Sequence, residues 1–198
     1  MMPVNVLVEG AMDEPVAIKL LEHAGLDVGR VYGRSGKVRL LKSSVSYNKA
    51  AHFEPWFVLV DLDQDAQCPS QAVSVWMPQP SRGMRFRVVV RSIEAWLLAD
   101  RESMARFLSV SLSKIPFQVE TDPDPKRTLI NIARSSRKGS IREDIVPQQG
   151  SGARVGPLYV ARLTDFVENY WEPDKGARQS ESLRRCINAL STLTSFGG

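Results

Sequence analysis

Acidic residues follow two apolar stretches of this chain. Glu9 comes directly after Val4–Val8, and Asp61 and Asp63 end the stretch that begins at Trp56. Each stretch has the length and composition of a buried strand. The carboxyl ends of strands in an open α/β sheet form the edge at which ligands bind. The pattern therefore predicts that these carboxylates converge, and convergent carboxylates suit a hard divalent cation such as Mg²⁺ or Mn²⁺.

The spacing Asp61-x-Asp63 has a geometric meaning if the strand continues through both residues. Alternate strand residues point to the same side, so the two carboxylates would face one ion, and Asp65 could support them. Glu9 would then act as a metal ligand or as a general acid or base. The alternative is that acidic residues after a strand are solvated loop residues or helix caps.

The elements that must position these residues alternate between strand and helix patterns in the first half of the chain. The expected strands are 4–8, 26–32, 56–62 and 84–90. The expected helices are 13–24, 37–51, 70–76 and one beginning near residue 93. This alternation predicts an α/β fold with a mainly parallel, Rossmann-like sheet flanked by helices.

The second half of the chain has helical patterns only. They cover residues 101–108, 125–135, 158–171 and 179–193. Trp171, Tyr170 and Phe166 are predicted to pack together between these helices. The chain is interpreted as a single domain, with an α/β core over residues 1–100 and a helical extension over 101–198.

Composition narrows the class of protein only a little. With 198 residues, 43% of them hydrophobic and 24% charged, the chain suits an ordinary globular domain. Its net charge of +4 weakly favours an anionic partner. Cys68 and Cys186 stand singly, which indicates neither a zinc site nor a disulfide framework. No signal peptide or membrane span is recognised, so a cytoplasmic protein is expected, as a monomer or a homodimer.

Three short motifs carry a resemblance to a known family. They are VEGAMDE at Val8–Glu14, the pair Asp61-x-Asp63 and the element Ser92-x-Glu94. In this order they resemble the TOPRIM domain of primases, topoisomerases and related nucleases, in which a Glu after the first strand and a later Asp-x-Asp hold the metal. The closest similarity is to the overcoming-lysogenization-defect nucleases and to the bacterial family called domain of unknown function 4276. The stretch Ser92–Asp100 resembles a typical signature of the latter family, and the motifs cover about residues 3–100.

The resemblance implies a two-metal phosphodiesterase mechanism. The implied metal ligands are Glu9 and Asp13 on one side and Asp61, Asp63 and Glu94 on the other, with Ser92 in support. The related nucleases also use a late Lys to stabilise charge during phosphoryl transfer. Lys126 and Lys138 are the candidates for this role, and Lys138 is preferred.

A basic stretch in the second half could bind a phosphate backbone. Its cationic residues are Lys126, Arg127, Arg134, Arg137, Lys138 and Arg142, with no acidic residue among them. A solvated basic face is the alternative interpretation.

The stretch Gly33–Val38 resembles a phosphate-binding loop but lacks its spacing and its terminal hydroxyl. No ATPase is therefore predicted, whereas the related nucleases carry a fused one. The predicted function is a metal-dependent nuclease acting on DNA or RNA, and the resemblance implies a phage-defence effector that works with a separate ATPase subunit. Two alternatives stay open: a non-catalytic module that docks to an ATPase partner or to nucleic acid, and phosphoryl or nucleotidyl transfer to a small phosphorylated ligand.

Overall fold

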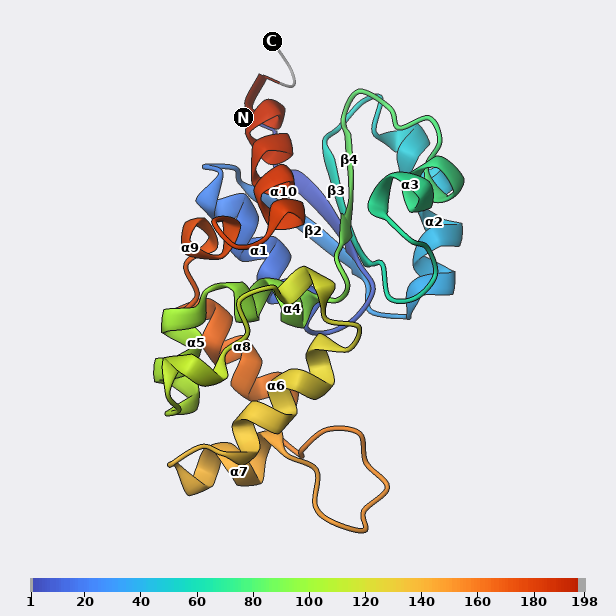
Figure 1. The fold of residues 1–198 in the computed structure, drawn as a ribbon. Helices are drawn as coiled ribbons and strands as arrows, with labels where there is room; N and C mark the ends of the chain where they lie inside the picture. Colours follow the sequence, from blue (N-terminus) through green and yellow to red (C-terminus); the bar gives the residue numbers. More distant parts are fainter. Residues whose placement is uncertain (1, 196–198) are drawn as a thin grey trace. The chain divides into compact units, whose positions relative to one another are not determined.

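The computed structural model describes residues 2–195 (Figure 1). It divides into two compact units. The first contains the residues up to Val90 together with those from Glu181 onward, and the second is Arg91–Ser180. The chain thus enters the second unit directly after the fourth strand, and its last helix belongs to the first unit. The sequence-based interpretation assigns all residues after 100 to one helical extension.

A four-stranded parallel sheet forms the centre of the first unit. Its strands are β1 (Val4–Val8), β2 (Val28–Gly33), β3 (Trp56–Asp61) and β4 (Met84–Val89), in the order β2-β1-β3-β4. All three pairings are parallel. The predicted α/β fold with a Rossmann-like sheet is confirmed. The strand order reverses between β1 and β3, which is the place where open α/β sheets bind ligands.

Helices cover both faces of this sheet, which explains why β1 and β3 are almost wholly apolar. The helices are α1 (Asp13–His23), α2 (Lys37–Ala50), α3 (Pro69–Trp76) and α10 (Glu181–Ser191), followed by the 3₁₀ helix η3 (Thr192–Ser195). One core cluster joins Leu7, Val58 and Phe86 of the sheet to Leu40 of α2 and Ala72 of α3. The sheet edge is therefore built on a rigid layer.

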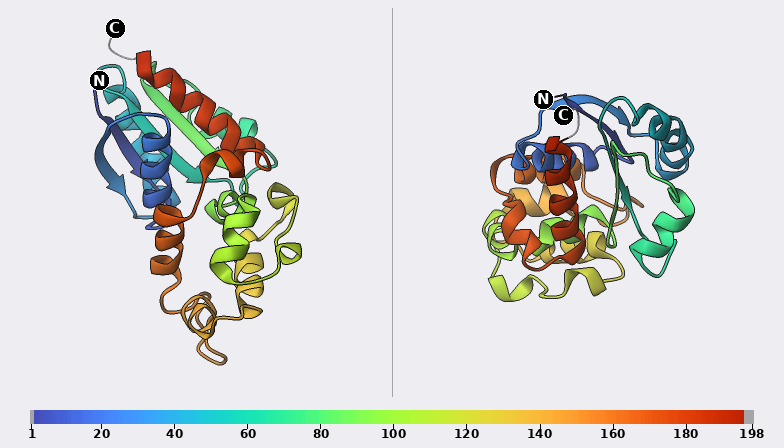
Figure 2. Two further views of the ribbon diagram at one scale, coloured as in Figure 1. Left: turned by 90° about the vertical axis from the view of Figure 1, so that its left-hand side faces the viewer. Right: turned by 90° about the horizontal axis from the view of Figure 1, so that it is seen from above.

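The last helix of the chain lies along β4 (Figure 2). Alternate residues of β4 are apolar and basic, and Arg85 donates hydrogen bonds to the Ala189 carbonyl at 3.1 Å and to Thr192 Oγ1 at 2.9 Å. Arg85 thus finds its partners at the end of α10 and the start of η3.

The second unit is helical. Its α-helices are α4 (Ile93–Ala99), α5 (Arg101–Leu108), α6 (Pro125–Arg134), α7 (Gly139–Ile145), α8 (Tyr159–Asn169) and α9 (Pro173–Ala177). Two 3₁₀ helices, η1 (Leu112–Lys114) and η2 (Val119–Thr121), connect α5 to α6. All seven residues of α4 are buried, so this helix is the centre of the unit.

The expected packing of three aromatic residues is only partly correct. Phe166 and Trp171 are buried, but Tyr170 has 49% of its surface exposed. The chain leaves helical geometry at Tyr170, the residue after α8, and this places its side chain outside the core. The short helices α7 and α9 are also absent from the sequence-based expectation, because they begin at Gly139 and Pro173, which usually indicate a loop.

None of the helices within residues 2–195 has both the length and the hydropathy needed for a membrane span.

Candidate functional site

The carboxyl edge of the sheet brings Glu9 and Asp61 together. Glu9 follows β1 and Asp61 is the last residue of β3, and these two strands are hydrogen-bonded neighbours. The Asp61 backbone N–H donates a hydrogen bond to the Glu9 carboxylate. The predicted convergence of these two acidic positions at the reversal of strand order is therefore present in the fold.

Lys37 is a site residue that the sequence-based interpretation does not include. Its Nζ lies 2.5 Å from Asp63 Oδ2 and 2.7 Å from Asp65 Oδ2, and its side chain is only 14% exposed. The ammonium also lies 5.6 Å from the centre of the Trp76 ring. The Lys37 ammonium thus forms ion pairs with two of the predicted acidic residues.

Two glycines place Lys37 at this edge. Gly33 has a φ of +103°, and a Cβ added to it would stand 2.0 Å from the Val8 carbonyl oxygen, so only glycine allows this approach to β1. Gly36 has a φ of +85° and immediately precedes α2, which begins at Lys37. The sequence signal for Lys37 was a glycine-rich turn after a strand followed by a cation.

The carboxylate of Glu9 is in an unfavourable environment for its charge. Burial raises its pKa, the nearby Lys37 lowers it, and the Asp63 charge raises it again, with a net upward shift. Its Oε2 atom is buried and has no hydrogen-bond partner among the described residues. A buried carboxylate oxygen without a partner at a ligand-binding edge is what a cation or a proton would satisfy.

The electrostatics of Lys37 are the counterpart of those of Glu9. Burial alone lowers the pKa of Lys37, but its hydrogen bonds to Asp63 and Asp65 outweigh burial and the net pKa is raised. Lys37 therefore stays protonated, and its positive charge compensates part of the negative charge at the edge.

The proposed geometry of the Asp61-x-Asp63 pair is wrong. The strand ends at Asp61, and Asp63 adopts a left-handed backbone with a φ of 50°. Because Asp63 lies in a turn, strand alternation does not align the two carboxylates. Asp63 instead reaches the edge through its ion pair with Lys37.

Asp13 closes the turn after β1. It is the first residue of α1, it is 6% exposed, and its Oδ2 accepts a hydrogen bond of 2.6 Å from the Gly10 N–H. This contact ties the start of the helix to the residue that follows Glu9. Asp13 thus has a structural task in addition to the metal-binding role implied by the resemblance.

In the second unit, Glu94 is 1% exposed and has partners on both carboxylate oxygens. Ser92 Oγ donates to Oε2 at 2.7 Å, and the Tyr159 hydroxyl donates to Oε1 at 2.8 Å. Lys126 Nζ lies 3.4 Å from Oε1. The Ser-x-Glu element is therefore a local hydrogen-bonded pair, as its spacing around the start of α4 allows.

The two candidate lysines lie in different surroundings. Lys126, at the start of α6, is the one that pairs with a member of the predicted acidic set, Glu94. Lys138 precedes α7 and lines a cavity with Arg106 and Arg162. All six residues of the basic stretch are exposed: Lys126, Arg127, Arg134, Arg137, Lys138 and Arg142.

The fold and the edge together define an α/β protein whose parallel sheet carries acidic side chains and Lys37 at its carboxyl end. Across residues 2–195, no three His, Cys, Asp or Glu side chains are arranged to hold a metal ion. Comparisons with protein-family models, with curated proteins and with solved structures found no match to this chain. The resemblance to TOPRIM nucleases stays a prediction.

Proposed function

We propose that the first unit binds Mg²⁺ or Mn²⁺ at its carboxyl edge and hydrolyses phosphodiester bonds in DNA or RNA. The observation that carries the proposal is Glu9. Its pKa is raised mainly by burial, and its Oε2 atom, at the edge where the strand order reverses, has no hydrogen-bond partner within residues 2–195. Perturbed groups of this kind concentrate at functional sites.

The residues that would hold the cation are Glu9, Asp61 and Asp63, with Asp65 in support. Their oxygen atoms are the ligand type that Mg²⁺ and Mn²⁺ prefer. When bound, the cation would activate water and neutralise charge on the leaving phosphate oxygen. If Glu9 is not a ligand of the cation, its raised pKa brings it closer to neutrality, and it would instead accept or return a proton.

Lys37 determines how such a site would work. In the structure it takes up the charge of Asp63 and Asp65, so a divalent cation must compete with its ammonium. Once displaced from the two carboxylates, Lys37 would be available to bind a phosphate oxygen of the substrate. Metal and substrate would then bind together more readily than the metal alone.

The nucleic-acid part of the proposal is supported by the exposed basic stretch on α6, α7 and the turn between them. Cationic side chains of this kind contact the phosphate backbone irrespective of base sequence. A role in phage defence with a separate ATPase subunit is supported by the family resemblance only.

A second candidate function is a non-catalytic module that docks to an ATPase partner or to nucleic acid. The same ion pairs favour it, because Lys37 already neutralises Asp63 and Asp65 and removes the need for a metal. The two candidates differ in whether the acidic edge binds a divalent cation.

The test is a calorimetric titration of the whole chain with Mn²⁺, combined with cleavage assays on plasmid DNA and on RNA. We expect Asp61→Ala to lose Mn²⁺ binding and cleavage. The matched control is Asp27→Ala, which removes an exposed carboxylate just before β2, at the opposite edge of the sheet. Mn²⁺ binding without cleavage in the wild type would support the metal site and contradict hydrolysis by this chain alone, and absence of Mn²⁺ binding would refute the metal site and favour the docking module.

A further inference from the structure

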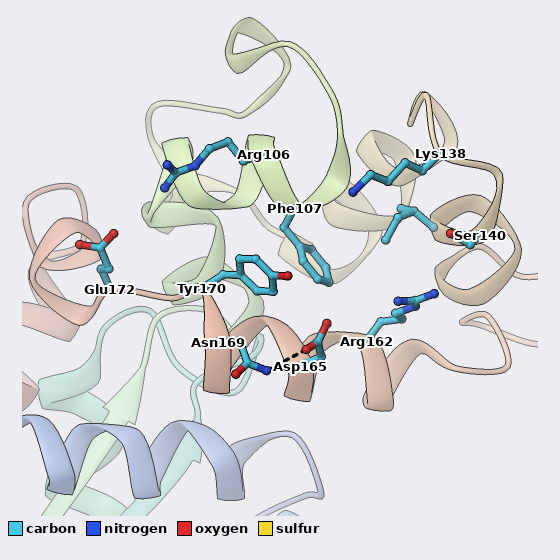
Figure 3. Close-up of a pocket in the computed structure, with 10 residues that line it drawn as sticks. Arg106, Phe107, Lys138, Ser140, Arg162, Asp165, Asn169, Tyr170 and Glu172 are labelled. Atoms are coloured by element: carbon cyan, nitrogen blue, oxygen red, sulfur yellow. Dashed lines mark hydrogen bonds between the residues drawn. The ribbon is translucent and has the colours of Figure 1, made fainter.

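A second site lies entirely within the second unit. A cavity of about 440 Å³ is formed by residues of α5, α7 and α8 and by the residues after α8 (Figure 3). Its volume falls in the range of pockets that bind small ligands. Among the residues that line it are Arg106, Lys138, Arg162, Asp165, Asn169 and Tyr170.

The cationic residues that line the cavity lie on different sides of it (Figure 3). Arg106 and Lys138 are both exposed, and the Lys138 side chain extends from the start of α7 towards the helix that carries Arg106 and Phe107 (Figure 3). The charge of Arg162 is already taken, because its guanidinium lies 2.6 Å from Asp144. The Arg106 guanidinium donates to the Ser103 hydroxyl at 3.2 Å and extends away from Lys138, with Phe107 and Tyr170 between the two side chains (Figure 3). Lys138 is therefore placed to bind a phosphate group in the cavity.

An aromatic surface stands beside these cations. Tyr170 is 49% exposed, and its ring lies against Phe107 with centroids 5.5 Å apart and planes tilted by 53°. Phe107 in turn packs on the buried Phe166 with centroids 5.1 Å apart. Tyr170 is thus supported from the core while one part of its ring faces the cavity. A supported, exposed aromatic ring is the feature on which nucleobases stack.

A polar pair follows next to the ring. Asn169 Nδ2 donates a hydrogen bond of 2.8 Å to Asp165 Oδ1, and Figure 3 shows the two side chains below Tyr170. This bond orients both groups and leaves the Asn169 carbonyl and further carboxylate lone pairs as acceptors. Acceptors in this position suit the exocyclic amino group of a base such as adenine.

We propose that this cavity binds one nucleotide that carries a phosphate and an amino-bearing base. Lys138 binds the phosphate, Tyr170 stacks on the base, and Asp165 and Asn169 accept hydrogen bonds from its amino group. The source is either a mononucleotide or the 5′-phosphorylated end of a strand. The proposal uses no residue of the acidic edge and stands without the proposed metal site.

The experiment measures nucleotide binding by calorimetry on the whole chain in EDTA, so that metal binding and cleavage play no part. The probes are AMP, UMP, adenosine and inorganic phosphate. We expect AMP to bind more tightly than each of the other three. Tyr170→Ala should weaken AMP binding by about fivefold or more, whereas Tyr170→Phe should retain it, because stacking needs the ring and not the hydroxyl. Lys138→Ala should weaken AMP binding and leave adenosine binding unchanged.

The control is Asp27→Ala, which lies in the other unit and should bind AMP like the wild type. Thermal melting of each variant separates a loss of contact from a loss of folding. Oligo(dA) with a 5′-phosphate or a 5′-hydroxyl distinguishes the two sources: a preference for the phosphorylated end assigns the cavity to a strand, and binding of AMP alone assigns it to a mononucleotide. Absence of AMP binding at millimolar concentration, or equal AMP affinity in Tyr170→Ala and the wild type, would overturn the proposal.

Discussion

Glu9 and Glu94 are two acidic residues in very different environments. Glu94, in the second unit, is 1% exposed and receives hydrogen bonds from Ser92 and Tyr159 and the charge of Lys126. Glu9, in the first unit, is only partly buried, yet one of its oxygens has no hydrogen-bond partner in the described part of the chain, and neighbouring carboxylates repel it. The more deeply buried carboxylate is the better satisfied one.

The difference separates a structural role from a functional one. If a carboxylate whose two oxygens both accept hydrogen bonds is removed, its donors are left without an acceptor, and the fold is destabilised. When a carboxylate in an unfavourable environment is neutralised, the fold loses little stability. Such carboxylates occur where they bind a ligand or exchange a proton. The comparison thus predicts that the loss of the Glu94 carboxylate destabilises the fold, whereas neutralisation of the Glu9 carboxylate does not.

The largest expected effect is that of Glu94→Ala. The substitution leaves Ser92, Tyr159 and Lys126 without their shared acceptor and should lower the free energy of unfolding by about 3 kcal/mol. Urea denaturation of the whole chain measures this. Tyr159→Phe removes the hydroxyl that donates to Glu94 and should cost about 1 kcal/mol. A fully stable Glu94→Ala variant that loses metal-dependent cleavage would assign Glu94 to catalysis, as the resemblance implies.

The next effect concerns the cation that the acidic edge already contains. Lys37→Met removes the ammonium from Asp63 and Asp65 and should raise the affinity for Mn²⁺ by about tenfold or more, because the metal no longer competes with it. The matched control is Lys42→Met, an exposed lysine on the same helix. Calorimetric titration of both variants tests this. Unchanged Mn²⁺ affinity in Lys37→Met would show that the metal, if bound, does not use these carboxylates.

The parts of the fold that could be predicted follow from local patterns. The apolar stretches of β1 and β3 are recognisable because a parallel sheet covered on both faces needs continuous apolar strands. The meeting of Glu9 and Asp61 follows from the rule that parallel strands share their carboxyl edge. These inferences need only the order of strands and helices along the chain.

The parts that could not be predicted depend on contacts between distant segments. The turn at Asp63 and the ion pairs of Lys37 involve two loops that meet only when β1, β2 and β3 are in place. Likewise, an amphipathic pattern identifies α10 as a helix but does not say that it returns to β4, where Arg85 finds its partners. The exposure of Tyr170 depends on where α8 ends, which periodicity defines poorly.

The smallest expected effect is that of Glu9→Gln, and its sign is opposite to that of Glu94→Ala. Because the pKa of Glu9 is raised in the folded state, the native protein holds this proton more tightly than the unfolded chain. The contribution of Glu9 to stability therefore falls as the pH rises from the ordinary Glu pKa, about 4.3, through the raised value. Glu9→Gln cannot ionise and should be more stable than the wild type at pH 7, by less than about 1 kcal/mol because the group is partly solvated.

Below about pH 4 both side chains are neutral, so this advantage of Glu9→Gln should disappear. Thermal melts of the two proteins between pH 4 and pH 8 measure their difference in stability at each pH. Because every other titratable group is present in both proteins, the contributions of those groups cancel in this difference. If Glu9→Gln were instead the less stable protein at pH 7, the charged carboxylate would be satisfied in the native state. Glu9 would then belong with Glu94 among the structural acids, and the observation that supports a cation site at the sheet edge would be lost.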